Sequence, residues 1–459
     1  MRFGKPFTRP FTSPFGAPFF IGGGGGGGST DFELTIKTDN SGGVTNNDQF
    51  RLGTISSGVY DFVVDWGDGS SDAITAFDDP ALTKTYALAG TYNLKISGNT
   101  YEYPYFFNGD DAKLVSIDNG GILSFATSAN SAFRDSANLE QLSFINTTGV
   151  NSFNEAWFNC NSLGSFPLID MSAGTSFVST WRDCNSLNSF PIIEMSAGIN
   201  FTGTWFSCTG LISFPLIDMS AGTGFISTWR NCNSLTSFPI IQMPLGTNFN
   251  GTWRDCKSLN SFPSIQMPLA NNFDGTWRDC TSLALFPLID MSAGINFGNT
   301  WNFCLSLNSF PLIDTSSGTN FNSTWRTCIS LNPFPLIDMS SGTIFISTWQ
   351  GCTSLTSFPS IDMSAGTIFN STWRDCTSLT SFPLIDMSAG TNFDGTWRDC
   401  ALDTTSIDNV MQILVNNGRS NLSTNLSGGT NLGFSNWSAG AVANYNTLIG
   451  LGWTITTNA

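Results

Sequence analysis

Cysteine and tryptophan recur through this chain of 459 residues at one fixed interval, and both residue types can carry chemistry. Eleven cysteines stand 24 residues apart, and a tryptophan lies three residues before each of them. The cysteines are Cys160, Cys184, Cys208, Cys232, Cys256, Cys280, Cys304, Cys328, Cys352, Cys376 and Cys400. The tryptophans are Trp157, Trp181, Trp205, Trp229, Trp253, Trp277, Trp301, Trp325, Trp349, Trp373 and Trp397. So strict a period predicts one supersecondary unit that is copied and stacked.

Regularly spaced cysteines suggest either disulfides or a metal site. Stacked copies of one unit would lie close enough for a disulfide, whose Cα atoms are ~4.4–6.8 Å apart. However, the number of cysteines is odd, and Ser136 occupies the same column one period earlier. A zinc site needs paired cysteine spacings or histidine, and the chain has neither. We therefore expect buried, unpaired thiols that behave as small apolar side chains and form a structural ladder with the tryptophans.

A column of aspartates follows the same period and is the second candidate for chemistry. Its members are Asp170, Asp218, Asp290, Asp314, Asp338, Asp362 and Asp386. Stacked carboxylates repel one another, so hydrogen bonds, solvent or a cation must relieve them, and calcium prefers carboxylate oxygen. An aspartate that follows a strand also accepts hydrogen bonds from the N–H groups of a turn. We favour this structural role and keep structural calcium as the alternative.

The composition argues against several classes of function. Charged residues make up 11% of the chain and the net charge is −16. Nucleic acid is therefore an unfavourable partner, because its binding needs a basic surface. The chain lacks histidine, the commonest general base, and no apolar stretch reaches the ~18 residues of a membrane-spanning helix. We predict a non-enzymatic protein without a cofactor, a catalytic site or membrane insertion.

Phenylalanine recurs every four residues at the N-terminus. The five positions are Phe3, Phe7, Phe11, Phe15 and Phe19. Proline precedes four of them and favours an extended, polyproline-like path. Residues 1–21 are predicted to be an assembly anchor that lays its Phe-Pro units into a partner, with a disordered tail as the alternative. Residues 22–30 contain seven consecutive glycines and predict a flexible linker. Prolines interrupt the apolar residues that follow Arg2, so no secretory signal peptide is expected.

Residues 31–100 have the alternating pattern of half-buried strands. The alternation is clearest at residues 32–38, 60–66 and 91–97. The segment Val64-Asp-Trp-Gly-Asp-Gly-Ser70, followed by Lys84-Thr-Tyr86 and Gly90-Thr-Tyr-Asn-Leu94, resembles the PKD-like immunoglobulin sandwich. In that family the domain is a spacer or an adhesion module. Asp65 and Asp68 are expected to cap a turn, with a cation site as the alternative.

The 24-residue unit itself contains several apolar columns. In the unit that begins at Leu163 they are Leu163, Phe166, Leu168 or Ile169, Met171, Phe177, Trp181 and Cys184. The first part has the spacing of leucine-rich repeats and predicts a short strand that pairs in parallel with its copies. Pro167 limits this strand to two or three residues, because proline lacks an N–H. Gly174 predicts a turn with positive φ, and residues 177–184 have the spacing of a short helical turn.

The triplet Trp181, Cys184 and Leu187 carries a family resemblance. An aromatic residue three before a cysteine and a leucine three after it resemble the BspA-type leucine-rich repeat of bacterial surface antigens, especially the variant of mycoplasma-type surface lipoproteins. The resemblance covers roughly residues 112–400 and implies a solenoid. Members of this family adhere to host proteins or cells. Tryptophan replaces the Met-Phe or Ala-Phe of many relatives, which leaves the partner open.

The predicted fold is therefore a repeat solenoid of leucine-rich-repeat-like parallel coils of 24 residues, preceded by a small PKD-like β-sandwich and closed by an α+β C-terminal cap. The divisions are an anchor tail (1–21), a polyglycine linker (22–30), the β-sandwich (31–100), an initial cap or degenerate repeat (101–132), the solenoid (133–400) and the C-terminal cap (401–459). In that cap, which resembles the terminal module of phage and bacterial-surface repeat proteins, we expect helices at 402–419 and 441–451 and a final strand from Gly452.

These features favour a virion structural or adhesion protein of a tailed bacteriophage, located in the virion or at an extracellular surface. It would be a fibre or a receptor-facing appendage. Its partners would be other virion proteins through residues 1–21, a host-surface protein or glycan, and further copies of this chain. The alternatives are a bacterial cell-surface adhesin and a capsid decoration protein without a receptor.

Overall fold

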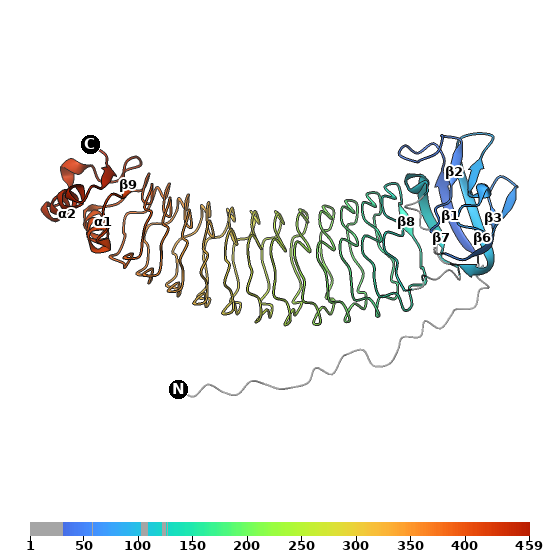
Figure 1. Cartoon of the computed structure of the whole chain (residues 1–459), viewed down its shortest axis with the longest axis horizontal. Helices are drawn as coiled ribbons and strands as arrows, with labels where there is room; N and C mark the ends of the chain where they lie inside the picture. The colour runs from blue at the N-terminus through green and yellow to red at the C-terminus, as the bar shows by residue number, and fades with distance from the viewer. Residues whose placement is uncertain (1–30, 57, 102–108, 122–124, 126) are drawn as a thin grey trace, which may run out of the picture.

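The structure is a computed structural model that describes residues 31–459 except 57, 102–108, 122–124 and 126. The predicted anchor tail and linker lie outside the described residues. Figure 1 shows a long, curved row of coils between an N-terminal unit of strands and a C-terminal unit of helices. Among the described residues, no helix is long and apolar enough to cross a membrane.

The N-terminal unit is built on a six-stranded sheet. Its strands are β1 (Phe32–Lys37), β3 (Tyr60–Asp65), β4 (Ser71–Ile74), β6 (Thr91–Tyr101), β7 (Leu114–Asn119) and β8 (Gln141–Leu142), in the order β4-β3-β6-β1-β7-β8. A separate pair joins β2 (Gln49–Arg51) to β5 (Thr83–Thr85). Burial alternates strictly along β3, as a strand with one apolar face requires. Leu34, Val64 and Trp66 are fully buried in the core.

The sheet continues past residue 100, where the β-sandwich was predicted to end. Strand β7 pairs antiparallel with β1 and parallel with β8. It is therefore the last strand of the N-terminal unit and the first parallel step of the repeats. Just before it, the buried Asp110 carboxylate accepts backbone hydrogen bonds from Val44 and Arg51, and buried Lys113 lies 3.8 Å from the same carboxylate. These contacts fix the 44–51 loop against the junction.

The repeat array, as we call residues 128–400, consists of stacked 24-residue coils in parallel register. Isolated bridges join residues one period apart, such as Ser165 to Ser189 and Ser176 to Asn200. The strands predicted at two or three residues are thus shorter still, reduced to single bridging residues. Pro167 and its equivalents explain this, because proline has no N–H to donate to a neighbouring coil.

The helical turn predicted for residues 177–184 is wrong. The N–H groups of Phe177, Ser179, Trp181 and Asp183 donate across to carbonyls of the next coil at 2.8–2.9 Å. The intervening N–H groups donate to the carbonyl three residues earlier, as in consecutive β-turns. Ser179 and Asp183 have φ of 53° and 62°. The apolar spacing is right, but a helix would keep every N–H inside the segment, whereas here half of them hold the coils together.

The positive φ predicted for Gly174 is also wrong, because neither Gly174 nor its equivalents fall in the left-handed region. The column is small for a steric reason. A Cβ on Gly174 would lie 2.5 Å from Cζ of Phe177 and 3.1 Å from the ring of Phe153. At the one coil with alanine, Ala270, the ring centroids of Phe249 and Phe273 are 6.2 Å apart. The other stacked pairs in this column lie at 5.3–5.6 Å.

The C-terminal unit closes the array, as predicted. Helix α1 (Thr404–Asn417) begins at its N-cap Asp403 and ends at Gly418. Strand β9 (Ser423–Asn425), helix α2 (Ala439–Gly450) and strand β10 (Thr454–Thr456) follow. The Asn417 amide donates to the carbonyls of Met387, Ser388 and Gly390, and the Asn431 amide to that of Trp397. Side chains of the cap thus satisfy carbonyls that a further coil would otherwise meet.

Gly318→Ala should destabilise the array, because its Cβ would lie 2.6 Å from Cζ of Phe321. We expect the free energy of unfolding to fall by ~1–3 kcal/mol, the usual cost of overpacking. Denaturant titration checks this. The matched control is Ala270→Gly, which removes a methyl group from a coil that already accommodates it and should change stability by less than ~1 kcal/mol. Equal stability of Gly318→Ala and the parent would contradict the steric explanation.

Candidate functional site

The structure places all eleven tryptophans of the ladder in the interior, with no exposed surface. Successive indole rings stack with centroids 5.4–6.0 Å apart and planes within 9°. The phenylalanine of each Phe-Pro pair stands edge-on between two of them. Phe166, for example, lies 4.8 Å from Trp157 and 5.0 Å from Trp181. This ladder is the packed core of the array and offers no ring to a ligand.

The eleven cysteines are free thiols and are also fully buried. From Cys184 to Cys400, each Sγ donates to the carbonyl of the tryptophan in the preceding coil at 3.0–3.2 Å. Burial raises the pKa of these thiols, to about 12 for Cys376 and well above the ordinary 9.0 for most others. Each thiol therefore stays protonated at neutral pH and acts as a hydrogen-bond donor between coils.

Alkaline pH should destabilise the protein steeply. Because the folded pKa of each thiol lies above its unfolded value, this contribution is complete below pH ~9 and is lost as pH rises, since only unfolded chains ionise. The slope should be roughly 1.4 kcal/mol per pH unit for each thiol, on the order of 15 for all eleven. Denaturant titrations between pH 7 and pH ~10.5 measure this slope.

The control for this prediction is the double variant Cys256→Ser and Cys280→Ser. Serine already occupies the column at Ser136, and its hydroxyl does not ionise in this range. The double variant should flatten the slope above pH ~9 by about 3 kcal/mol per pH unit. An unchanged slope would show that the thiols ionise in the folded state.

The seven predicted aspartates lie exposed at the start of a turn in each coil. Each Oδ1 accepts a hydrogen bond from the backbone N–H two residues later, at 2.8–3.1 Å. At Asp314, the Ser316 hydroxyl and backbone N–H hold the pKa of the carboxyl below its usual value. Among the described residues, no group of three or more His, Cys, Asp or Glu side chains is placed to hold a metal ion. The geometry gives these aspartates the turn-bonding role.

Asp65 and Asp68 in the N-terminal unit play a similar part. Asp65 accepts from the N–H of Gly67 and Asp68 from that of Ser70. Hydrogen bonds from Ser70, together with Lys84 at 3.0 Å, lower the pKa of Asp68 to about 2. Both carboxylates therefore cap the turn between β3 and β4.

The Arg-Asp pairs form a partly exposed column on the turn wall. They pair mainly within one coil, as in Arg254 with Asp255 at 3.4 Å, although Arg230 also reaches Asp255 from the neighbouring coil at 3.9 Å. The guanidinium of Arg182 lies 4.4 Å from the ring of Phe206. Exposed pairs of this kind contribute little stability individually.

The sequence analysis missed a column of exposed apolar residues that runs along nearly the whole array. We call it the apolar stripe. It consists of Phe144, Leu168, Ile192, Leu216, Ile240, Leu288, Leu312, Leu336 and Leu384, which are 50–68% exposed. Serines, Ser264 and Ser360, occupy the column in the two remaining coils. Monomers rarely expose so long a contiguous row, which marks the stripe as an interaction surface.

A signal for the stripe was present in the Phe-Pro-(Leu/Ile)-Ile pattern. Leu168 and Ile169 were treated as alternatives for one core column, but adjacent residues of an extended chain point to opposite faces. Ile169 is buried and Leu168 is exposed. The coil-to-coil contact between Ser264 Oγ and the carbonyl of Leu288, at 2.8 Å, shows that successive members of the column are spatial neighbours.

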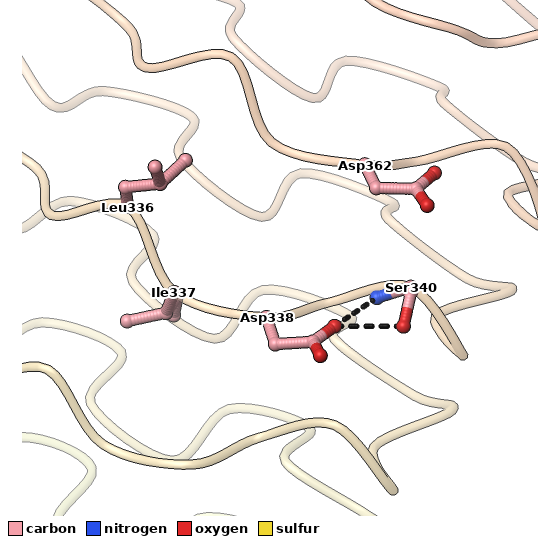
Figure 2. A pocket seen from close by; sticks show the side chains of 5 residues that line it. All are labelled: Leu336, Ile337, Asp338, Ser340 and Asp362. Carbon is pink, nitrogen blue, oxygen red and sulfur yellow. Dashed lines mark hydrogen bonds between the residues drawn. The ribbon is translucent and has the colours of Figure 1, made fainter. Parts of the chain in front are cut away.

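Acidic residues run parallel to the stripe, two positions further along each coil. This acidic column comprises Asp170, Glu194, Asp218, Asp290, Asp314, Asp338, Asp362 and Asp386. Figure 2 shows an open depression lined by Leu336, Ile337, Asp338, Ser340 and Asp362, in which the two carboxylates point the same way from neighbouring coils. The surface can therefore bury apolar groups of a partner and attract its cations at the same time.

Comparisons with known proteins give little further information. No family model matches the chain, and no curated protein matches it. Among solved structures, a leucine-rich repeat protein from Bacteroides ovatus matches with a TM-score of 0.31 and 15% sequence identity. The match covers 71% of this chain and 84% of the other. A TM-score at this level supports no assignment of fold or family.

Proposed function

We propose that this protein is a non-enzymatic structural or adhesion protein of a bacteriophage virion, a fibre or receptor-facing appendage. The array would be a BspA-type leucine-rich-repeat solenoid, and the N-terminal unit a PKD-like spacer. Residues 1–21 would dock on other virion proteins. In this proposal the array faces a host-surface protein or glycan, and several copies assemble together.

The observation that carries the proposal is the contrast between the interior and the surface of the array. The interior columns of tryptophan, cysteine and phenylalanine are packed and identical from coil to coil. The titratable groups bond turns or one another, so their geometry supports structure. The distinctive chemistry is an extended apolar stripe beside an acidic column. Such a surface suits attachment to another macromolecule.

A bacterial cell-surface adhesin is the second candidate. The same stripe and acidic column would serve adhesion from a cell, and the family resemblance of the repeat favours that setting. A capsid decoration protein would use the array only as a rigid spacer. Density for the intact particle would distinguish these candidates, because it would show whether the chain is present and which of its ends meets the particle.

Deleting residues 1–21 should leave the protein folded but abolish its incorporation into the particle. The cores and caps of the structure are formed by residues 31–459, so the thermal melt should change little. Burying each phenylalanine of the tail in a partner would contribute roughly 1.5–3 kcal/mol. Quantitative mass spectrometry of purified particles measures the occupancy.

The matched control for this deletion is the double variant Phe7→Ala and Phe11→Ala, which keeps the length of the tail and its charges. It should lower the occupancy without affecting the fold. Full occupancy of the truncated protein would contradict the anchor role.

A further inference from the structure

The apolar stripe requires an occupant that is both apolar and cationic. Its members are at least half exposed, and carboxylates flank them in eight coils. A second copy packed face to face through the stripe would bring two acidic columns together, and like charges at short range oppose such a dimer. The flanking charges therefore select a partner with aromatic or aliphatic side chains interspersed with lysine or arginine.

The chain contains one such segment outside the described residues. Residues 1–21 include five phenylalanines spaced four apart, together with Arg2, Lys5 and Arg9, and contain no acidic residue. The apolar and the charged parts of this tail both complement the surface formed by the stripe and the acidic column.

The point where the described chain begins lies at the head of the stripe. A Cβ on Gly121 would lie 2.7 Å from the carbonyl of Asp31, and a Cβ on Gly120 would lie 2.0 Å from that of Phe144. The backbone of Asp31 is therefore close to that of Phe144, the first member of the stripe. Residues 22–30 then need to bridge only a short distance before the tail reaches the array.

The lengths also agree. An extended polyproline-like path rises ~3.1 Å per residue, so Phe3 to Phe19 spans about 50 Å. From Phe144 to Leu384 there are ten coil-to-coil intervals, which at ~4.8 Å each span about 48 Å. With Phe19 near the head of the stripe, Arg9, Lys5 and Arg2 fall toward its far end. There, Asp290, Asp314, Asp338, Asp362 and Asp386 form an unbroken run of carboxylates.

We propose that residues 1–21 bind along the apolar stripe of their own chain, with phenylalanines on the aliphatic side chains and cations on the acidic column. A short linker gives the tail a high effective concentration at its own array, which favours this contact over one with a second copy. This inference goes beyond the proposed function and does not depend on it. In a virion, the stored tail would leave the stripe when the particle binds it.

Chymotrypsin, which cleaves after phenylalanine, tests the contact in the full-length protein. The rate of release of peptides ending at Phe7, Phe11 or Phe15, followed by mass spectrometry, should be at least about tenfold slower than in the free synthetic peptide 1–21. The double variant Leu312→Ser and Leu336→Ser should remove much of this protection. Serine already occupies the column at Ser264 and Ser360, so these variants should fold, and a thermal melt verifies that they do.

The matched control is Ile199→Thr and Ile295→Thr, which alters two exposed residues of another column where threonine also occurs, and it should leave the protection intact. Asp314→Asn with Asp338→Asn, and added salt, should weaken the protection because both reduce the charge attraction. Cleavage of the parent protein as fast as the free peptide would overturn the proposal. Protection that is lost over a roughly hundredfold dilution would also overturn it, because the occupied stripe would then belong to a second copy.

Discussion

The hydrogen bonds between coils on the turn wall are the constraint on which the rest of the structure depends. Every second N–H from Phe177 to Asp183 donates to the next coil, and the same pattern repeats along the array. These bonds permit one register only, an offset of 24 residues. Identical side chains are therefore forced into contact, and each column of the sequence becomes a continuous row of one residue type.

This forced contact explains which residues the interior tolerates. Flat rings stack well on copies of themselves, and the tryptophan and phenylalanine columns do so. The buried threonine before each tryptophan, as at Thr180, donates to a phenylalanine carbonyl of the preceding coil, while the cysteine donates to a tryptophan carbonyl. The stacking has a cost, because the indole N–H groups of the ladder have no hydrogen-bond partner in the part of the chain that the structure describes.

The surface obeys the same register, so even a weak preference becomes a long feature. One exposed leucine would be unremarkable, but nine aligned apolar residues form a row of about 48 Å, and the adjacent turns supply a parallel row of carboxylates. The turn-bonding role of these aspartates and a role in attracting a cationic segment are compatible, because Oδ1 bonds the turn and the group stays exposed. Structure and recognition thus share the same residues.

The sequence by itself determined the period, the inward columns and the helices of the C-terminal unit, because regular spacing and capping residues such as Asp403 and Gly418 are local signals. Only the tertiary structure decided the form of the turn wall, since helix and consecutive turns share the same apolar spacing and differ in where alternate N–H groups donate. It also decided why Gly174 is small, which depends on a ring from the neighbouring coil. Finally, it separated Leu168 from Ile169 and placed Phe144 beside Asp31, because exposure and proximity between distant segments are properties of the folded chain alone.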